Sequence, residues 1–205
     1  MKVSKEKAAE NREALIQAAG RLFRERGIDG VGIAEICAEA RLTHGALYAQ
    51  FPSKEALAVE ALADGLARGQ ARMTEPIDGR APSLAAHLDK YLSSQQRDNL
   101  GEGCAMAASA SEIARQGEAV SATFTDGFTQ LADAIECTLD GSPTQRRQEA
   151  LAIVAAMIGG LAVARATAKA NPALSDDILV AVRRLLGGLA GGARPAANKP
   201  RARRR

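Results

Sequence analysis

The sequence has few aromatic residues and no tryptophan. Phe, Tyr and Trp make up 3% of its 205 residues, whereas hydrophobic residues make up 46%. Sheets are enriched in aromatic and β-branched residues, and alanine, which is abundant here, has the highest helix propensity. We find no run that alternates apolar and polar residues as a strand does. The sequence therefore predicts an all-α protein of closely packed helices instead of a β-sandwich.

Cysteine and histidine are also scarce. The three cysteines are Cys37, Cys104 and Cys137, and the two histidines are His44 and His87. Widely spaced cysteines, odd in number, form no disulfide framework or metal-ligand spacing and favour a reduced, cytoplasmic setting. Neither histidine neighbours a nucleophile in a recognisable catalytic arrangement. We therefore expect no enzymatic activity, no metal site and no cofactor.

The sequence has no segment that we expect to interact with a membrane. Its N-terminus is charged and lacks the apolar region of a secretion signal. The longest uncharged run, from Ala150 to Ala164, is 15 residues long. A transmembrane helix needs about 20 apolar residues. We therefore expect a soluble protein with no membrane partner.

The net charge of +3 is unevenly distributed. Residues 1–56 carry nine Lys or Arg against eight Asp or Glu, residues 57–192 carry twelve against sixteen, and residues 193–205 carry six against none. The excess positive charge therefore lies in the tail ARPAANKPRARRR, whose prolines and lack of apolar periodicity predict disorder. Two interpretations of the basic ends of the chain stay open. They either contact the phosphates of a nucleic acid or are solvated, disordered segments.

Apolar periodicity and turn residues divide the chain into helices. Gly27 ends the first helix, and Pro76 and Pro82 separate the fourth from the fifth. The predicted helices lie at about residues 4–26, 33–40, 44–50, 53–73, 83–97, 104–115, 118–139, 144–170 and 175–190.

Residues 33–54, IAEICAEARLTHGALYAQFPSK, are the most informative segment. Apolar residues recur at positions i, i+3, i+4 and i+7 from Ile33, which predicts a short amphipathic helix. Thr43 is a favourable N-cap for a second short helix, which buries Leu47. Two helices joined by so short a turn form a helix-turn-helix, whose second helix can enter the DNA major groove.

At these residues the chain resembles the TetR family of transcriptional regulators, over about residues 10–65. The matching residues are Leu47-Tyr48, Phe51, Ser53-Lys54-Glu55-Ala56-Leu57 and, upstream, Ala18-Ala19, Leu22-Phe23 and Gly27. The resemblance implies a homodimeric repressor that a small-molecule inducer or thiol modification releases from a palindromic double-stranded DNA operator. It also implies a three-helix DNA-binding domain at 1–56, a ligand-binding and dimerisation domain at 57–192 and a basic tail at 193–205.

The resemblance also implies which residues meet DNA. The residues expected to face bases are His44, Gly45, Tyr48 and Gln50, and those expected to hold the backbone are Thr43, Tyr48 and Lys54. A helix N-terminus favours phosphate, and a glycine lets the backbone approach the bases. Taken singly, His44 is more often a surface histidine, Tyr48 a half-buried aromatic residue and Lys54 a solvated residue at a helix N-terminus. Their joint placement in the motif favours DNA contact.

The segment also departs from the family pattern. The family often has a Thr or Ser at the start of the first motif helix and an Arg soon after, where this chain has Val31, Gly32 and Ala34. Two phosphate contacts are therefore expected to be lost. An alternative function is that of a helical interaction or scavenging module without specific DNA binding.

The last two predicted helices indicate a dimer interface. Residues 151–164 are apolar around most of the helix, which requires burial on more than one side. The predicted contact residues are Leu151, Val154, Ile158 and Leu161, with Leu185 and Leu189 beside them, and Gly159-Gly160 permits close helix crossing. The alternative is a central core helix in a monomeric bundle.

The second domain supplies candidate ligand contacts. They are His87, Tyr91, Cys104, Met106, Phe124, Phe128 and Met157, which are otherwise core residues. Few charges lie among them, so we expect an apolar or mildly polar effector. Cys104 stands at a predicted helix start, where the pKa of a thiol is lowered, so it is a candidate sensor of electrophiles. The alternative is a small buried hydrophobic residue.

Overall fold

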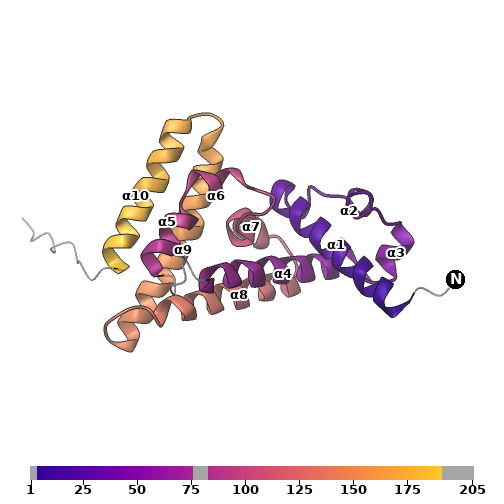
Figure 1. Cartoon of the computed structure of the whole chain (residues 1–205), viewed down its shortest axis with the longest axis horizontal. Coiled ribbons are helices and arrows are strands. Elements are labelled where there is room, and N and C mark those ends of the chain that lie inside the picture. Colours follow the sequence, from indigo (N-terminus) through magenta and orange to yellow (C-terminus); the bar gives the residue numbers. More distant parts are fainter. Residues whose placement is uncertain (1–3, 76–82, 191–205) are drawn as a thin grey trace, which may run out of the picture.

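The computed structural model describes residues 4–75 and 83–190, and this part of the chain is all-helical, as predicted (Figure 1). The helices are α1 (Lys5–Arg26), α2 (Ile33–Glu39), α3 (His44–Tyr48), α4 (Lys54–Thr74), α5 (Leu84–Tyr91), α6 (Ser94–Asp98), α7 (Ala105–Ile113), α8 (Glu118–Glu136), α9 (Pro143–Ala168) and α10 (Pro172–Ala190). The predicted tail at 193–205 and the breaking prolines Pro76 and Pro82 lie outside the described residues.

One predicted helix is in fact two. The sequence predicted a single helix at 83–97, but Leu92 has φ −93° and ψ 54°, which ends α5. The Ser93 hydroxyl then accepts a hydrogen bond from the Gln96 backbone N–H at 3.2 Å and begins α6. Ser93 therefore begins a second helix, and α5 does not continue through it. The spacing of apolar residues alone does not reveal this break.

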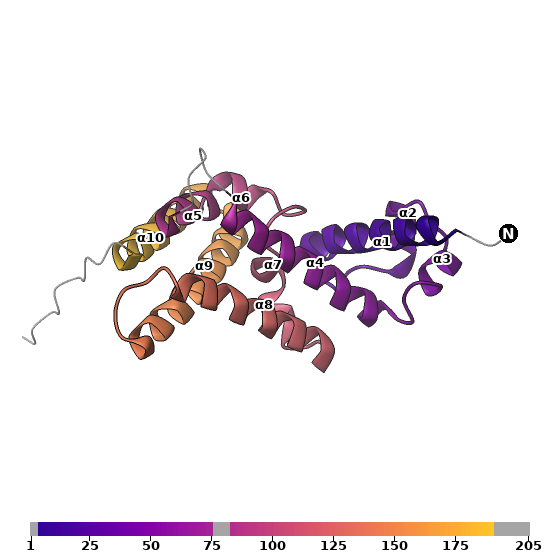
Figure 2. The ribbon, with the colours of Figure 1, turned by 60° about the horizontal axis from the view of Figure 1, so that its bottom comes forward.

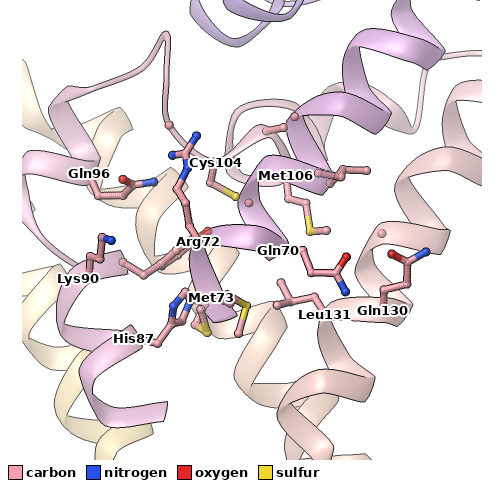
Figure 3. Close-up of a pocket in the computed structure, with 18 residues that line it drawn as sticks. Gln70, Arg72, Met73, His87, Lys90, Gln96, Cys104, Met106, Gln130 and Leu131 are labelled. Carbon is pink, nitrogen blue, oxygen red and sulfur yellow. The ribbon is translucent and has the colours of Figure 1, made fainter. Parts of the chain in front are cut away.

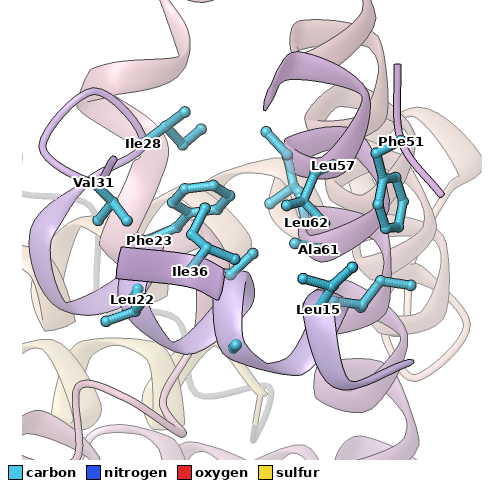
Figure 4. Packing of buried hydrophobic residues seen from close by; sticks show 14 of the residues in the cluster. Leu15, Leu22, Phe23, Ile28, Val31, Ile36, Phe51, Leu57, Ala61 and Leu62 are labelled. Carbon is cyan, nitrogen blue, oxygen red and sulfur yellow. The ribbon is translucent and has the colours of Figure 1, made fainter. Parts of the chain in front are cut away.

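Helices α1 to α3 and the first half of α4 form a small head with its own core. Leu15, Leu22 and Phe23 from α1 are buried against Ile36 of α2 and Leu57 of α4 (Figure 4). Each large apolar side chain buried in this way contributes about 1.5–3 kcal/mol to folding. This packing fixes the angle at which α3 projects from the head.

The turn between α2 and α3 depends on Arg41. Its φ is +56°, in the left-handed region that non-glycine residues seldom adopt. The Leu42 backbone N–H donates to the Cys37 carbonyl at 2.8 Å, and that of Arg41 donates to the Ala38 carbonyl at 3.1 Å. These two bonds form a Schellman motif, which ends α2 abruptly and redirects the chain into α3.

Helix α4 connects the head to the remaining helices. Its first turns bury Leu57, Ala58 and Ala61 in the head core, while Leu66 also packs on the second core. Figures 1 and 2 both show α4 running from α1 toward α8. A shift of this one helix therefore moves the head relative to the body.

Helix α9 is the centre of the second core and packs against α10. A Cβ added at Gly160 would lie 3.1 Å from the Val182 side chain, so this glycine lets the two helices approach closely. By length and composition alone α9 could cross a membrane, because its most apolar window of 18 residues has a mean hydropathy of 1.9, but a buried core helix passes the same test. In this structure the apolar residues of α9 form part of the core, since eight of them are buried within the chain.

The predicted dimer contacts on α9 need correction. Val154, Ile158 and Leu161 are 0%, 6% and 0% exposed and pack in the core of their own chain. The outward face instead carries Leu151, which is 37% exposed, and Gly159, where an added Cβ would meet no atom within 4 Å. The sequence showed that α9 is apolar on several sides but not which side its own body covers.

Candidate DNA interface and ligand pocket

The N-terminal end of α3 is an exposed surface of small and polar residues. Thr43, His44 and Gly45 are all exposed, and Tyr48, one turn further on, is 56% exposed. A Cβ added at Gly45 would meet only the Thr43 hydroxyl, at 3.9 Å, so packing does not require glycine there. This helix end offers backbone N–H groups and hydrogen-bonding side chains to a ligand that approaches from outside the protein.

Two further predicted contacts flank this surface. Lys54 is the first residue of α4, whose N-cap Ser53 accepts a hydrogen bond from the Ala56 backbone N–H at 3.0 Å. Gln50 was predicted to lie on the recognition helix, but α3 ends at Tyr48, and Gln50 is half-buried in the turn that follows. The apolar residue Phe51 draws the chain into the head core directly after Gln50, which explains the early end of α3.

The start of α2 has a support that the sequence did not reveal. Gly32 lacks a capping hydroxyl, but the Glu35 carboxylate accepts a hydrogen bond from the Gly32 backbone N–H at 2.8 Å. Arg26 of α1 holds the same carboxylate at 2.6 Å. The Gly32 hydrogen bond and then Arg26 lower the pKa of Glu35, so its carboxylate stays ionised. The helix-turn-helix is therefore capped despite its departure from the family pattern.

The body contains a cavity of about 90 Å³ beside the second half of α4. Water-sized cavities are only about a tenth of this volume, so it has room for several solvent molecules or a small ligand. Its wall is formed by Gly65, Leu66, Gly69, Gln70, Arg72, Met73, His87, Lys90, Tyr91, Gln96, Gly103, Cys104, Ala105, Met106, Gly127, Gln130, Leu131 and Met157 (Figure 3). Helices α4, α5, α6, α7, α8 and α9 all contribute.

Five of the seven predicted ligand contacts line this cavity, namely His87, Tyr91, Cys104, Met106 and Met157. Phe124 and Phe128 do not: they pack as half-buried residues on the core clusters. Sequence reasoning missed the α4 wall, including Gln70, Arg72 and Met73. These residues lie in the predicted connector helix, and only tertiary contact with α7 and α8 makes them part of a pocket.

Cys104 stands where one end of the cavity meets α7. It is half-buried, and its sulfur caps α7 by accepting from the Ala107 backbone N–H at 3.5 Å. Burial, and then the neighbouring Cys104, raise the pKa of Tyr91 well above its ordinary value. The phenol is therefore neutral at pH 7 and available as a hydrogen-bond donor.

His87 is the only histidine at the cavity. Burial, and then the charge of Lys90, lower the pKa of its imidazole below 6.5. Its ring lies against that of Tyr91, with 5.9 Å between centroids. The imidazole is therefore neutral at pH 7, and the cavity wall carries its positive charge on Arg72 and Lys90.

A short exposed helix on a packed three-helix head, joined by one helix to a body with a cavity, defines a helix-turn-helix DNA-binding regulator. The family model "Bacterial regulatory proteins, tetR family" matches residues 15–61, which span most of this head. The head therefore carries the DNA-binding domain of the TetR family of transcriptional regulators.

Individual relatives extend this similarity beyond the head. The transcriptional regulator LmrA of Bacillus subtilis is 29% identical over 170 residues, which are 78% of this chain and 88% of LmrA. The transcriptional repressor BepR of Brucella suis is 43% identical over 54 residues, 26% of each chain. The similarity is thus higher over the head alone than over the whole chain.

Solved structures share the fold of the whole chain. A TetR-family regulator from Cytophaga hutchinsonii matches with a TM-score of 0.71 and 20% identity, covering 92% of this chain and 98% of that one. The reduced form of Escherichia coli NemR matches with a TM-score of 0.67 and 21% identity, covering 85% and 95%. At these identities the comparison shows a common fold and carries no information on the ligand.

The burial of neutral His87 predicts a pH dependence of stability. The unfolded chain takes up this proton near the ordinary pKa of 6.5, whereas the folded protein resists it. The stabilisation is therefore complete above about pH 6.5 and declines as the pH falls through the lowered pKa. His87→Gln should flatten the decline in free energy of unfolding between about pH 7.5 and 5.5, measured by urea denaturation.

The exposed histidine offers a matched control, His44→Gln. An unchanged slope in His87→Gln would contradict the burial of a neutral ring at the cavity.

Proposed function

We propose that the protein is a homodimeric repressor that leaves a palindromic operator when an effector occupies the cavity or modifies Cys104. The observation that carries this proposal is the path of α4. Its first turns are part of the head core, and its last turns form a wall of the cavity. An effector that displaces Arg72 or Met73 therefore changes the position of the helix that carries the DNA-binding head. The setting is cytoplasmic and the role is not enzymatic.

A second connection between cavity and head supports this proposal. The loop before Cys104 receives a hydrogen bond from each side: Arg24 of α1 donates to the Gly101 carbonyl at 2.6 Å, and Arg72 of α4 donates to the Glu102 carbonyl at 2.8 Å. Arg24 is buried, and the loss of a hydrogen bond by a buried charged group is costly. Any movement of Cys104 is thereby transmitted to the end of α1.

We propose the functional division at residues 1–56 for DNA binding and 57–192 for ligand binding and dimerisation. The two core clusters support two units. The head core extends through Leu57 to Leu62, so the first turns of α4 belong physically to the head while its far end serves the effector domain. The tail at 193–205 is proposed as a basic extension.

We propose that Thr43, His44, Gly45, Tyr48, Gln50 and Lys54 form the DNA contact. Tyr48→Ala and Lys54→Ala should each weaken operator binding by about 1–3 kcal/mol with unchanged helicity, since neither side chain is buried in the core. Lys54→Ala should also reduce the slope of log K against log salt by about one, because one phosphate contact is lost. Fluorescence anisotropy on a duplex selected from a random pool measures both.

The matched control is Lys169→Ala, an exposed lysine at the end of α9, far along the chain from the head. It should bind the selected duplex as the unsubstituted protein does. His44→Ala should change which bases are preferred. If selection from the random pool enriches no duplex, specific DNA binding fails, and an interaction module of the same fold becomes the better proposal.

The outward faces of α9 and α10 are the proposed dimer interface. On α10, apolar or small residues recur at alternating spacings of four and three, at Leu174, Ile178, Ala181, Leu185 and Gly188. Leu174 and Leu185 are 46% and 61% exposed, an unusual position for leucine in a single chain. On α9 the outward side carries Ala155, Gly159, Ala162 and Ala166, whose small side chains permit close helix approach. Two such pairs form a four-helix interface.

Leu185→Glu should give a folded monomer, because this side chain is exposed in its own chain and only the second copy would cover it. Size-exclusion chromatography with light scattering measures the mass, and circular dichroism measures the fold. Ala173→Glu adds the same charge to α10 away from this stripe and should remain dimeric. A dimer that survives Leu185→Glu, or an unsubstituted protein that is monomeric at micromolar concentration, would refute this interface.

Covalent modification of Cys104 is the proposed alternative to reversible effector binding. N-ethylmaleimide should release the protein from its operator, because the added group must enter the cavity beside α4. Cys104→Ser should abolish this release, whereas Cys137→Ser, which removes the exposed thiol, should not. Anisotropy of the labelled operator reports the release. Release that persists in Cys104→Ser would leave Cys104 as a packing residue and the reversible route alone.

A further inference from the structure

The charged side chains of the cavity wall all have one sign. Arg72 and Lys90 line the cavity, and no Asp or Glu is among the lining residues of the described chain. The other polar groups are the amides of Gln70, Gln96 and Gln130, the Tyr91 phenol, the Cys104 thiol and the neutral His87 imidazole. A wall with positive charge and no carboxylate favours a ligand with a negative group and disfavours a cation.

One buried hydrogen-bond donor beside this wall has no partner among the described residues, the Nη1 atom of Arg165. The Arg165 side chain lies next to Gly103 of the wall, and the Tyr91 hydroxyl is a hydrogen-bond neighbour of the Cys104 thiol, a weak partner that a ligand can replace. The rest of the Arg165 guanidinium is held firmly, since it donates to the Arg97 carbonyl at 3.2 Å and the Gln96 carbonyl at 3.0 Å. Arg165, Tyr91 and Cys104 influence one another electrostatically, so they form one cluster.

Unpaired buried donors are costly, and their cost disappears when a ligand supplies acceptors. A carboxylate supplies two oxygen atoms with several lone pairs, and it pairs especially well with guanidinium. The surrounding carboxylates do not fill this role. Glu75 approaches Lys90 at 3.9 Å and Glu102 approaches Arg24 at 3.9 Å, and both acidic side chains are mostly exposed to solvent.

The remainder of the cavity is less charged and adaptable. Figure 3 shows Arg72, Lys90, Gln96 and Cys104 toward one side of the view, and Met106 and Leu131 toward the other, together with the amides of Gln70 and Gln130. Met73, Met106 and Met157 all line the cavity, and flexible thioether side chains accommodate ligands of varied shape. The cavity therefore has an end with positive charge and an end where apolar side chains and two neutral amides lie together.

We propose that the cavity selects a small carboxylate with an apolar body, whose carboxylate oxygens accept hydrogen bonds at the Arg72, Tyr91 and Arg165 end while its body contacts Met106 and Leu131. The proposal deepens the proposed function, because it names the chemical class of the effector of that same cavity. It differs from the expectation from sequence, which was an apolar or mildly polar effector.

Three probes of nearly equal shape test the charge preference: benzoate, benzamide and benzylamine. Isothermal titration calorimetry on the free protein at about pH 7.5 should show benzoate binding at least about tenfold more tightly than benzamide, as expected for a charge-assisted hydrogen bond. Benzylamine should bind more weakly than either. Equal affinities for the three probes, tighter binding of benzylamine or no binding of benzoate at millimolar concentration would overturn the proposal.

Substitutions locate the site. Arg165→Gln and Arg72→Gln should each reduce the preference for benzoate over benzamide to about threefold or less, while Lys169→Gln, which removes a charge outside the cavity, should keep it. Arg165 also donates hydrogen bonds to α6, so the folding of Arg165→Gln is checked by circular dichroism. If Arg165→Gln does not fold, the binding preference of Arg72→Gln decides the test. A preference that survives in Arg72→Gln as in Lys169→Gln would place the carboxylate elsewhere and overturn the proposal.

Operator release is measured separately from binding. If benzoate binds with the expected preference but leaves the protein on its operator, the carboxylate site stands and the proposed effector response fails. If the free protein shows no preference while another compound releases the operator from it, the proposed function stands and the carboxylate site is wrong.

Discussion

Helix α4 has to satisfy two cores at once, and the rest of the structure depends on this constraint. Its first turns are fixed in the head by the burial of Leu57 and Ala61, and further along, Leu66 packs on the second core. A single rigid helix cannot adjust one end without moving the other. The head and the cavity therefore have a mechanical connection that needs no flexible hinge between them.

Polar contacts between distant segments make this connection specific. Arg24 reaches from α1 to the Gly101 carbonyl, and Glu112 of α7 accepts from the Asp29 backbone N–H at 2.9 Å. Both contacts join the head to the segment that carries Cys104. Hydrophobic contacts tolerate small shifts, but hydrogen bonds weaken when their geometry changes, so these two bonds favour one position of the Cys104 segment relative to the head.

The outer helices show how one apolar sequence serves two surfaces. On α9, the residues that seemed most suitable for a dimer, Val154 and Ile158, are covered by the chain itself. Gly160 permits this by removing a side chain opposite Val182, and the adjacent Gly159 faces open space. The outer stripe that remains is made of small residues, together with exposed leucines on α10.

The sequence by itself determined the helical class, the helix-turn-helix and the exposed face of α3, because these follow from local spacing, capping and a specific motif. It also located five cavity residues, among them Cys104 and Tyr91, from their helical positions. Only the tertiary structure decided the direction in which α9 faces, the contribution of α4 to the cavity wall and the donor at Arg165 that has no partner among the described residues. Those features arise where helices distant in the sequence meet, and the periodicity of one helix shows that a face is apolar but not what covers it.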